Sequence, residues 1–212
     1  MSAEILRVSA QSPSADVLRY AAERLQHGEV VAVPTDTVYG LAADPFNLSA
    51  VEEIFRVKGR QEDRALPILV KSIEQALLLA RDVPDAFLTL ANKFWPGALT
   101  LVVEATHRLP LKVTGNTGRV ALRWADSQII AALIEAVGGP VTGTSANLSG
   151  RPSCTNVPQL VEQLGERLPL ILDAGDTGGT LGSTIVRIEG DSWSIARQGA
   201  LPDAEIHRAF SA

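Results

Sequence analysis

The sequence predicts an α/β protein built on one twisted, open, mixed β-sheet flanked by helices. Along its 212 residues, apolar side chains repeat first with the period of a helix and then with that of a buried strand. Gly190 and Asp191 separate the last two predicted strands and suit a hairpin turn, so the sheet is not purely parallel. No repeat and no proline- and serine-rich linker interrupts this order. We therefore expect a single domain over 1–212, with its core at about 8–201.

Helix and strand signals alternate through the first half of the chain. Ser14 opens a helix that Gly28 ends, and apolar residues one turn apart give it a buried face. Ser49 and Ser72 each precede a Glu or Gln by three residues, the spacing of a capping box, and so open further helices. The expected elements are, in order, helix 14–28, strand 29–33, a helix from Ser49, strand 66–71, a helix from Ser72, and a helix that begins near Pro84 and stops before Pro96.

The second half is richer in strands. A loop of glycine, threonine and asparagine at 114–118 separates two apolar runs, and Gly138 with Gly139 ends a helix. The expected elements are, in order, strands 98–104 and Arg119–Arg123, helix Gln128–Val137, strand 140–144, helix 158–164, strands 169–173, 183–189 and Ser192–Arg197, and a short helix from Asp203 to about Phe210.

Composition argues against several classes of protein. The chain has 19 basic and 24 acidic side chains, and its formal charge of −5 disfavours a protein that coats nucleic acid. Cys154 is the only cysteine, which excludes an internal disulfide and a multi-cysteine zinc site, and we predict no metal-ligating residues. No apolar run reaches the roughly 18 residues of a membrane helix. No secretory signal opens the chain, so we expect a cytoplasmic protein without a membrane partner.

Two stretches nevertheless carry a local excess of positive charge. Residues 54–71 hold five basic and two acidic side chains, and residues 105–125 hold four basic and no acidic ones. Basic residues clustered in this way more often lie on the solvent-exposed surface than in a binding site. Arg123, however, closes an apolar strand, which places its guanidinium at a sheet edge or in a crevice. An arginine in that position suits bidentate binding of a carboxylate or a phosphate.

Segments rich in hydroxyl groups and glycine lie next to several predicted strands, at 34–41, 143–150 and 182–184. Ligands of open α/β sheets bind beyond strand ends, where such loops present hydroxyls and backbone N–H groups. Each segment alone could be a hydrogen-bonded turn, but together they indicate a site for a polyanion. The common glycine motifs for nucleotides are absent. The nucleophile elbow is absent too, so nucleophilic catalysis has little support.

The motifs in these segments resemble those of the YrdC-like family of threonylcarbamoyl-AMP synthases. Residues 34–41 are similar to the family's P-T-[DE]-T-V-Y-G-L. Lys58-Gly59-Arg60, with Ser145-Ala146-Asn147 far downstream, is similar to its K-x-R…S-x-N signature. Segments 94–100, 120–123, 182–184 and 197–199 also match in the family's order, so the resemblance runs from about Val8 to Leu201.

This resemblance implies a YrdC/RibB-like fold around a basic concave surface, in the single-domain form of the family. It also implies a nucleotidyltransferase that joins L-threonine, bicarbonate or CO₂, and ATP into threonylcarbamoyl-AMP and releases diphosphate. ATP would be a substrate, with Mg²⁺ carried on its phosphates. A separate transferase would pass the group to adenosine 37 of tRNA, which makes that enzyme and tRNA indirect partners.

Residue roles are implied by the same motifs. Lys58 and Arg60 would act in catalysis. Thr37, Arg123 and Ser183 would bind threonine, with Arg123 on its carboxylate. The residues expected to line the ATP site are Lys58, Arg60, Arg64, Ser145, Asn147, Ser153 and Arg197.

The sequence departs from the family pattern at three of these places. Arg64 stands where the family often has Lys or Asn, and Cys154 replaces a common proline beside Ser153. Arg119 stands where smaller hydroxyl residues are common, and no role is assigned to it. Two alternatives stay open: an RNA-binding module of the same fold, whose affinity would fall with salt and ignore ATP, and a paralogue that uses another carbamoyl or adenylate substrate.

Overall fold

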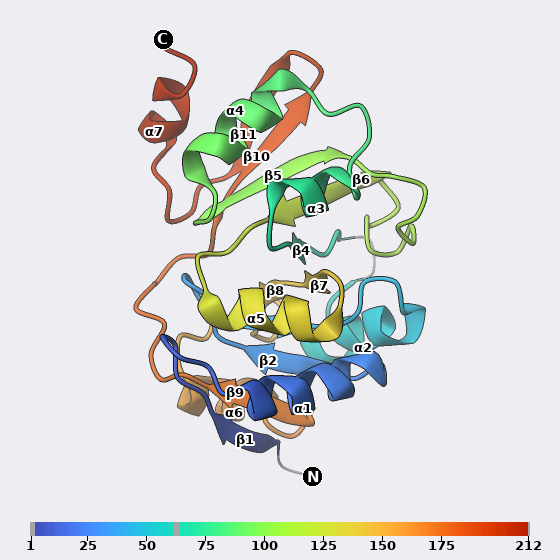
Figure 1. The fold of residues 1–212 in the computed structure, drawn as a ribbon, viewed down its shortest axis with the longest axis vertical. Coiled ribbons are helices and arrows are strands. Elements are labelled where there is room, and N and C mark those ends of the chain that lie inside the picture. The colour runs from blue at the N-terminus through green and yellow to red at the C-terminus, as the bar shows by residue number, and fades with distance from the viewer. Residues whose placement is uncertain (1–2, 62–63, 212) are drawn as a thin grey trace.

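The computed structural model describes residues 3–61 and 64–211, and its strands form two mixed sheets that lie end to end (Figure 1). The first sheet has the order β1 (Glu4–Arg7), β9 (Leu170–Asp173), β2 (Val31–Val33), β3 (Gly40–Ala42), β8 (Thr144–Ser145). The second has the order β11 (Ser192–Arg197), β10 (Thr184–Glu189), β5 (Leu99–Glu104), β6 (Arg119–Arg123), β4 (Ile68–Leu69), β7 (Val141–Thr142). Parallel and antiparallel pairs occur in both, which confirms the predicted mixed α/β class.

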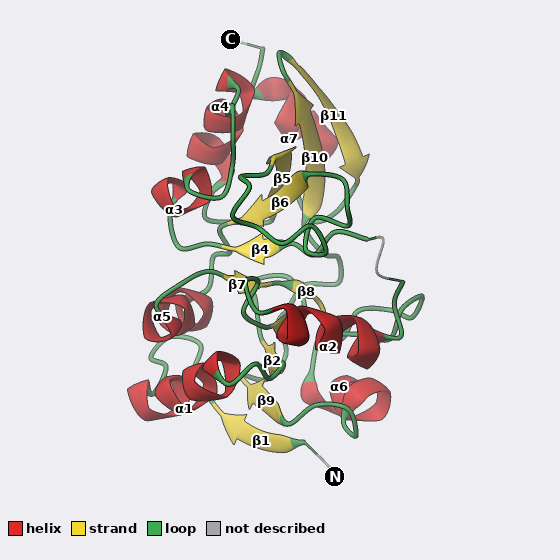
Figure 2. Ribbon diagram, turned by 90° about the vertical axis from the view of Figure 1, so that its right-hand side faces the viewer, coloured by secondary structure: helices red, strands yellow, loops and turns green. Residues whose placement is uncertain are grey.

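Helices cover both faces of the first sheet and one face of the second (Figure 2). The helices are α1 (Ala15–Gln26), α2 (Leu48–Lys58), α3 (Ile73–Leu77), α4 (Asp85–Phe94), α5 (Gln128–Val137), α6 (Val157–Leu164) and α7 (Asp203–Arg208). α1 and α5 pack together on one face of the first sheet, through residues such as Leu25 and Leu133, while α2 and α6 cover its other face. α4 buries Phe87 and Leu90 against β5. No described helix is long and apolar enough to cross a membrane.

Local signals in the sequence locate most of these elements to within one or two residues. The hydroxyl oxygen of Ser72 accepts from the backbone N–H of Gln75 at 3.1 Å, as its capping-box spacing predicts. The cap of α2 is different, because Asn47 rather than Ser49 accepts the bonds from the first turn. The exposed strand β1 and the short strand β3 were not expected.

The strands that we expected in a single sheet separate into two sheets at Gly143. The strand predicted at 140–144 is divided there, since β7 pairs within the second sheet and β8 within the first. A Cβ on Gly143 would lie only 2.4 Å from Cγ of the buried Leu69. The passage of the chain from β7 to β8 therefore favours a residue without a side chain at this position.

We expect Gly143→Ala to lower the free energy of unfolding by about 1–3 kcal/mol, because the added methyl group overlaps a side chain in a packed core. Gly139→Ala is the matched control, since a Cβ there would meet no atom within 4 Å. Urea unfolding of both variants measures the difference. An equal decrease in the free energy of unfolding of both variants would show that the close approach to Leu69 does not destabilise Gly143→Ala.

Candidate functional site

A cavity of about 670 Å³ lies between the two sheets. Its floor is one face of the second sheet, because alternate residues of β5, β6 and β10 line the cavity while the residues between them face the hydrophobic core. The floor residues are Thr100, Val102, Arg119, Ala121, Arg123, Ile185 and Arg187. The opposite wall comes from the first sheet, through the segment between β2 and β3 and through β8.

The cavity is strongly basic. Its arginines are Arg60, Arg64, Arg119, Arg123, Arg187 and Arg197, and no acidic side chain is among the described residues that line it. Other basic residues of the same two stretches lie outside, where Arg56 pairs with Glu53 and Lys71 with Glu135 at the surface. The two basic stretches are thus divided between solvated faces and the cavity. A concave, positively charged surface of this kind favours anionic ligands.

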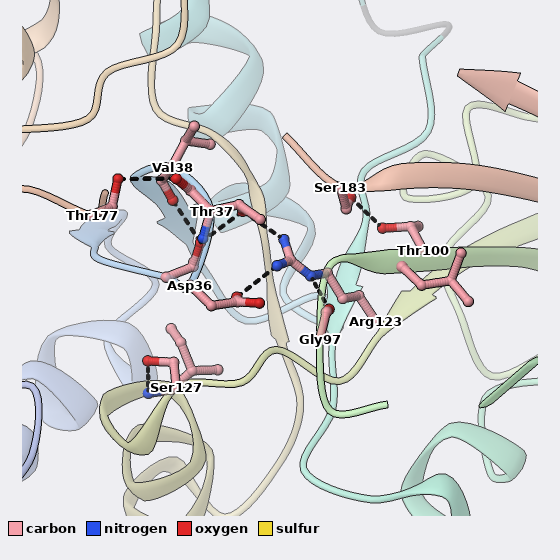
Figure 3. Close-up of polar contacts among 12 residues, drawn as sticks. Asp36, Thr37, Val38, Gly97, Thr100, Arg123, Ser127, Thr177 and Ser183 are labelled. Carbon is pink, nitrogen blue, oxygen red and sulfur yellow. Dashed lines mark hydrogen bonds and ion pairs between the residues drawn. The ribbon is translucent and has the colours of Figure 1, made fainter. Parts of the chain in front are cut away.

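Arg123 lies between the two sheets with only 6% of its surface exposed. Its Nη2 lies 2.6 Å from Oδ1 of Asp36, and its Nη1 donates to Oγ1 of Thr37 at 3.0 Å (Figure 3). Nε donates to the carbonyl of Gly97 at 3.0 Å. Burial lowers the pKa of Arg123 from its ordinary value, and the Asp36 carboxylate opposes that shift. The guanidinium is therefore held at a fixed position, at the end of the cavity floor that meets the first sheet.

A tight turn brings Asp36 and Thr37 to this position. The hydroxyl of Thr35 accepts from the backbone N–H of Thr37 at 3.1 Å and donates to the carbonyl of Val38 at 2.7 Å. The hydroxyl of Thr177 donates to the carbonyl of Thr37 at 3.0 Å, which ties the turn to the segment that leads from β9 to β10. On the floor beside it, the hydroxyls of Thr100 and Ser183 lie 2.7 Å apart (Figure 3).

Lys58 lies behind the cavity wall rather than in it, and it is 3% exposed. Its Nζ donates to the carbonyl of Ser145, and to the carbonyl of Asn147 at 3.0 Å and its Oδ1 at 3.5 Å. The hydroxyl of Ser145 in turn donates to Oδ1 of Asn147 at 2.6 Å. Burial, with Arg60 nearby, lowers the pKa of Lys58 to about 7. Lys58 and Asn147 therefore hold Ser145 at the cavity, while Arg60 enters it and donates to Oγ1 of Thr144 at 3.1 Å.

The structure brings most of the predicted site residues together. Those that line the cavity are Thr37, Arg60, Arg64, Arg123, Ser145, Ser153, Ser183 and Arg197. Lys58 and Asn147 do not line it. Sequence reasoning missed Thr100 and Arg187, and gave Arg119 no role. The alternation of side chains between the two faces of β10 could have identified Arg187. Arg187 lies on the same face as Ile185 and on the opposite face from the buried Val186.

A metal site built from side chains is not found in the described part of the chain. No three His, Cys, Asp or Glu side chains of residues 3–61 and 64–211 lie together as a group that could hold an ion. Cys154, which is fully buried, has a pKa raised to about 11 by that burial.

Comparison with known proteins identifies the family. The Sua5/YciO/YrdC family model, described as telomere recombination, matches residues 23–199. The chain belongs to this family. The resemblance expected from the motifs is thereby confirmed.

Relatives in this family match nearly the whole chain. A threonylcarbamoyl-AMP synthase of Pyrococcus abyssi is 38% identical over 91% of this chain and 57% of its own length. One of Photobacterium profundum is 35% identical over 87% of this chain and 100% of its own length. The crystal structure of P. abyssi Sua5 complexed with L-threonine superposes with a TM-score of 0.94 at 36% identity, over 98% of this chain and 61% of that one. The chain spans little more than half the length of the P. abyssi synthase.

We expect Asp36→Ala to lower the free energy of unfolding by about 3–5 kcal/mol, because it leaves the buried guanidinium of Arg123 without its anion. Glu135→Ala, which breaks the exposed pair with Lys71, should cost less than about 1 kcal/mol. Urea unfolding of the two variants makes the comparison. A loss of less than about 1 kcal/mol for Asp36→Ala would contradict a dependence of the fold on this ion pair.

The pKa of Lys58 predicts a pH dependence of stability. The folded amine loses its proton near pH 7, whereas the unfolded amine keeps it up to the ordinary lysine pKa of 10.5. Between these values the unfolded chain binds more protons, so stability rises with pH. The free energy of unfolding of the wild type relative to Lys58→Met should therefore increase from pH 7 to pH 9, by at most about 1.4 kcal/mol per pH unit. A difference that stays flat from pH 7 to pH 9 would refute the prediction.

Proposed function

We propose that the chain is an L-threonylcarbamoyladenylate synthase. It forms threonylcarbamoyl-AMP and diphosphate from L-threonine, bicarbonate or CO₂, and ATP, for the threonylcarbamoyl modification of tRNA. The observation that carries this proposal is the arginine-lined cavity, with Thr37, Arg123 and Ser183 grouped at one end. The close match to a relative's structure with L-threonine supports it.

The end of the cavity that holds Thr37, Arg123 and Ser183, which we call its inner end, suits an amino acid. A guanidinium has five N–H donors, and the contacts of Arg123 with described residues occupy one on each of its three nitrogens. The second N–H of each terminal nitrogen is left for a substrate carboxylate, which arginine binds in a bidentate manner. The hydroxyls of Thr37 and Ser183 then supply hydrogen bonds to the polar groups of threonine.

The wall of the cavity near β8, where Arg60 and Arg64 enter, suits the phosphates of ATP. Arg60 and Arg64 bring positive charge there, and Ser145 and Ser153 bring hydroxyl donors. Arg197 adds positive charge to the cavity from the end of β11 in the second sheet, where it donates to the carbonyl of Ser183 at 2.7 Å. The amine of threonine and CO₂ form a carbamate, with loss of a proton, and a carbamate oxygen attacks the α-phosphorus and displaces diphosphate. The protein contributes mainly by aligning the reactants and by neutralising the charge that develops, which is the role we give to Arg60.

Lys58 and Asn147 then act as positioning residues, because they hold Ser145 rather than line the cavity. Mg²⁺ would enter with ATP and be held mainly by its phosphates and water, since the described residues offer no group of carboxylates for it. Its chemistry is to neutralise charge on the phosphate oxygens. A separate transferase would use the product to modify tRNA, and we propose the cytoplasm as the place of the reaction.

Release of diphosphate tests the proposal directly. Purified protein with ATP, Mg²⁺ and bicarbonate should release diphosphate when L-threonine is added and should release little without it. No dependence on threonine would overturn the proposal. Salt-sensitive RNA binding that ignores ATP would favour the RNA-binding alternative instead.

We expect Ser183→Ala to raise the KM for L-threonine by about five- to tenfold, the effect of one lost hydrogen bond, with the KM for ATP changed by less than about twofold. Ser192→Ala, in the exposed hairpin between β10 and β11, should change neither constant. Steady-state kinetics with each substrate varied in turn measure this. Equal increases for both substrates would remove Ser183 from the threonine subsite.

A further inference from the structure

Thr35 lines the cavity beside Thr37, but its hydroxyl has no hydrogen bond left for a ligand. A hydroxyl group has one proton to donate and two lone pairs that accept. The proton of Thr35 goes to the carbonyl of Val38 at 2.7 Å. Its lone pairs serve the backbone N–H of Thr37 and the hydroxyl of Thr37, whose nitrogen and oxygen each lie 3.1 Å away. The bonding capacity of Thr35 is therefore used up within the turn.

This saturation decides the direction of the hydrogen bond between the two threonine hydroxyls. On distance alone, either oxygen could be the donor. Because Thr35 gives its only proton to the carbonyl of Val38, Thr37 is the donor and Thr35 the acceptor. Nη1 of Arg123 donates to the hydroxyl oxygen of Thr37 at 3.0 Å and so takes one of its lone pairs (Figure 3). The hydrogen bonds thus run in one direction, from Arg123 to Thr37, then to Thr35 and the carbonyl of Val38.

The hydroxyl of Thr37 is left with one free lone pair and no free proton. Since Thr37 lines the cavity, this lone pair is an acceptor for a ligand, next to the donors of Arg123. An α-amino acid has the matching pair of groups on one carbon atom, a carboxylate that only accepts and an amine whose N–H groups donate. With the carboxylate on Arg123, the amine comes within reach of Thr37.

We propose that Thr35 is the positioning residue that fixes the hydroxyl of Thr37 as an acceptor for the α-amine of the substrate. Thr35 does this without contacting the substrate itself. The inference deepens the proposed function and rests on it for the presence of L-threonine. Without the hydroxyl of Thr35, the proton of Thr37 loses its partner and is free to turn toward the amine, where two donors would face each other. The pre-organisation of the acceptor is then lost.

Calorimetric titration with L-threonine and with 3-hydroxybutyrate, which has the carboxylate and the hydroxyl but no amine, tests this role. Thr35→Val should weaken binding of L-threonine by about fivefold or more and binding of 3-hydroxybutyrate by less than about twofold. Thr35→Ser keeps the hydroxyl and should bind L-threonine within about twofold of the wild type. Thr106→Val is the matched control, because the Thr106 hydroxyl has no partner among the described residues and lies outside the cavity lining. It should change neither affinity.

The outcomes separate this inference from the proposed function. Equal weakening of both ligands by Thr35→Val would indicate a general disturbance of the turn, and an unchanged affinity for L-threonine would show that Thr35 does not orient Thr37. Both results overturn the inference. If Thr35→Val does not fold, the wild type decides, because it should bind L-threonine at least about tenfold more tightly than 3-hydroxybutyrate, and equal affinities would overturn the inference. Selective loss of L-threonine affinity in Thr35→Val, with no threonine-dependent release of diphosphate by the wild type, would support the role of Thr35 and refute the synthase.

Discussion

The buried ion pair between Arg123 and Asp36 is the constraint on which the site depends. Asp36 belongs to the turn after β2 in the first sheet, and Arg123 ends β6 in the second. Removing two charges from water is costly unless each has its partner and the remaining donors are bonded. Thr37 and the carbonyl of Gly97 complete that bonding. The pair thus fixes the two sheets relative to each other at the inner end of the cavity, where the proposed threonine subsite lies.

A second connection explains the spacing of the K-x-R…S-x-N signature. Gly59 ends α2 in the left-handed conformation, with φ of 58°, so the residues on either side of it face different ways. Lys58 faces the interior and donates to the carbonyls of Ser145 and Asn147, while Arg60 enters the cavity. Lys58 thereby shapes the cavity wall, and Arg60 presents its positive charge to a ligand. The four named residues of the signature therefore have two roles, because Lys58 and Asn147 hold the wall while Arg60 and Ser145 line the cavity.

The sequence predicts those helices and strands whose limits are set by local signals, such as apolar periodicity and turn residues. Strong periodicity locates α5, and the hairpin turn locates β10 and β11, to within a residue of their observed limits. β1 was missed because its residues lack apolar alternation and it is held by parallel pairing with a strand more than 160 residues away. The division of the predicted strand at 140–144 between two sheets was missed as well, because the close approach of Gly143 to Leu69 is equally non-local. Within the site, strand-end hydroxyls and Arg123 could be predicted, but the burial of Lys58 against the carbonyls of Ser145 and Asn147 required the packed fold.

The position of the cavity between two sheets has a thermodynamic consequence. Its walls are joined by polar contacts such as the ion pair of Asp36 with Arg123, beside a hydrophobic core to which both sheets contribute. A ligand that contacts both walls acts as a further cross-link, since it binds only when the sheets are correctly placed. Its binding free energy then adds to the free energy of folding by linkage. Occupancy of the cavity and the stability of the fold are therefore linked, so a ligand that contacts both sheets should stabilise the whole molecule.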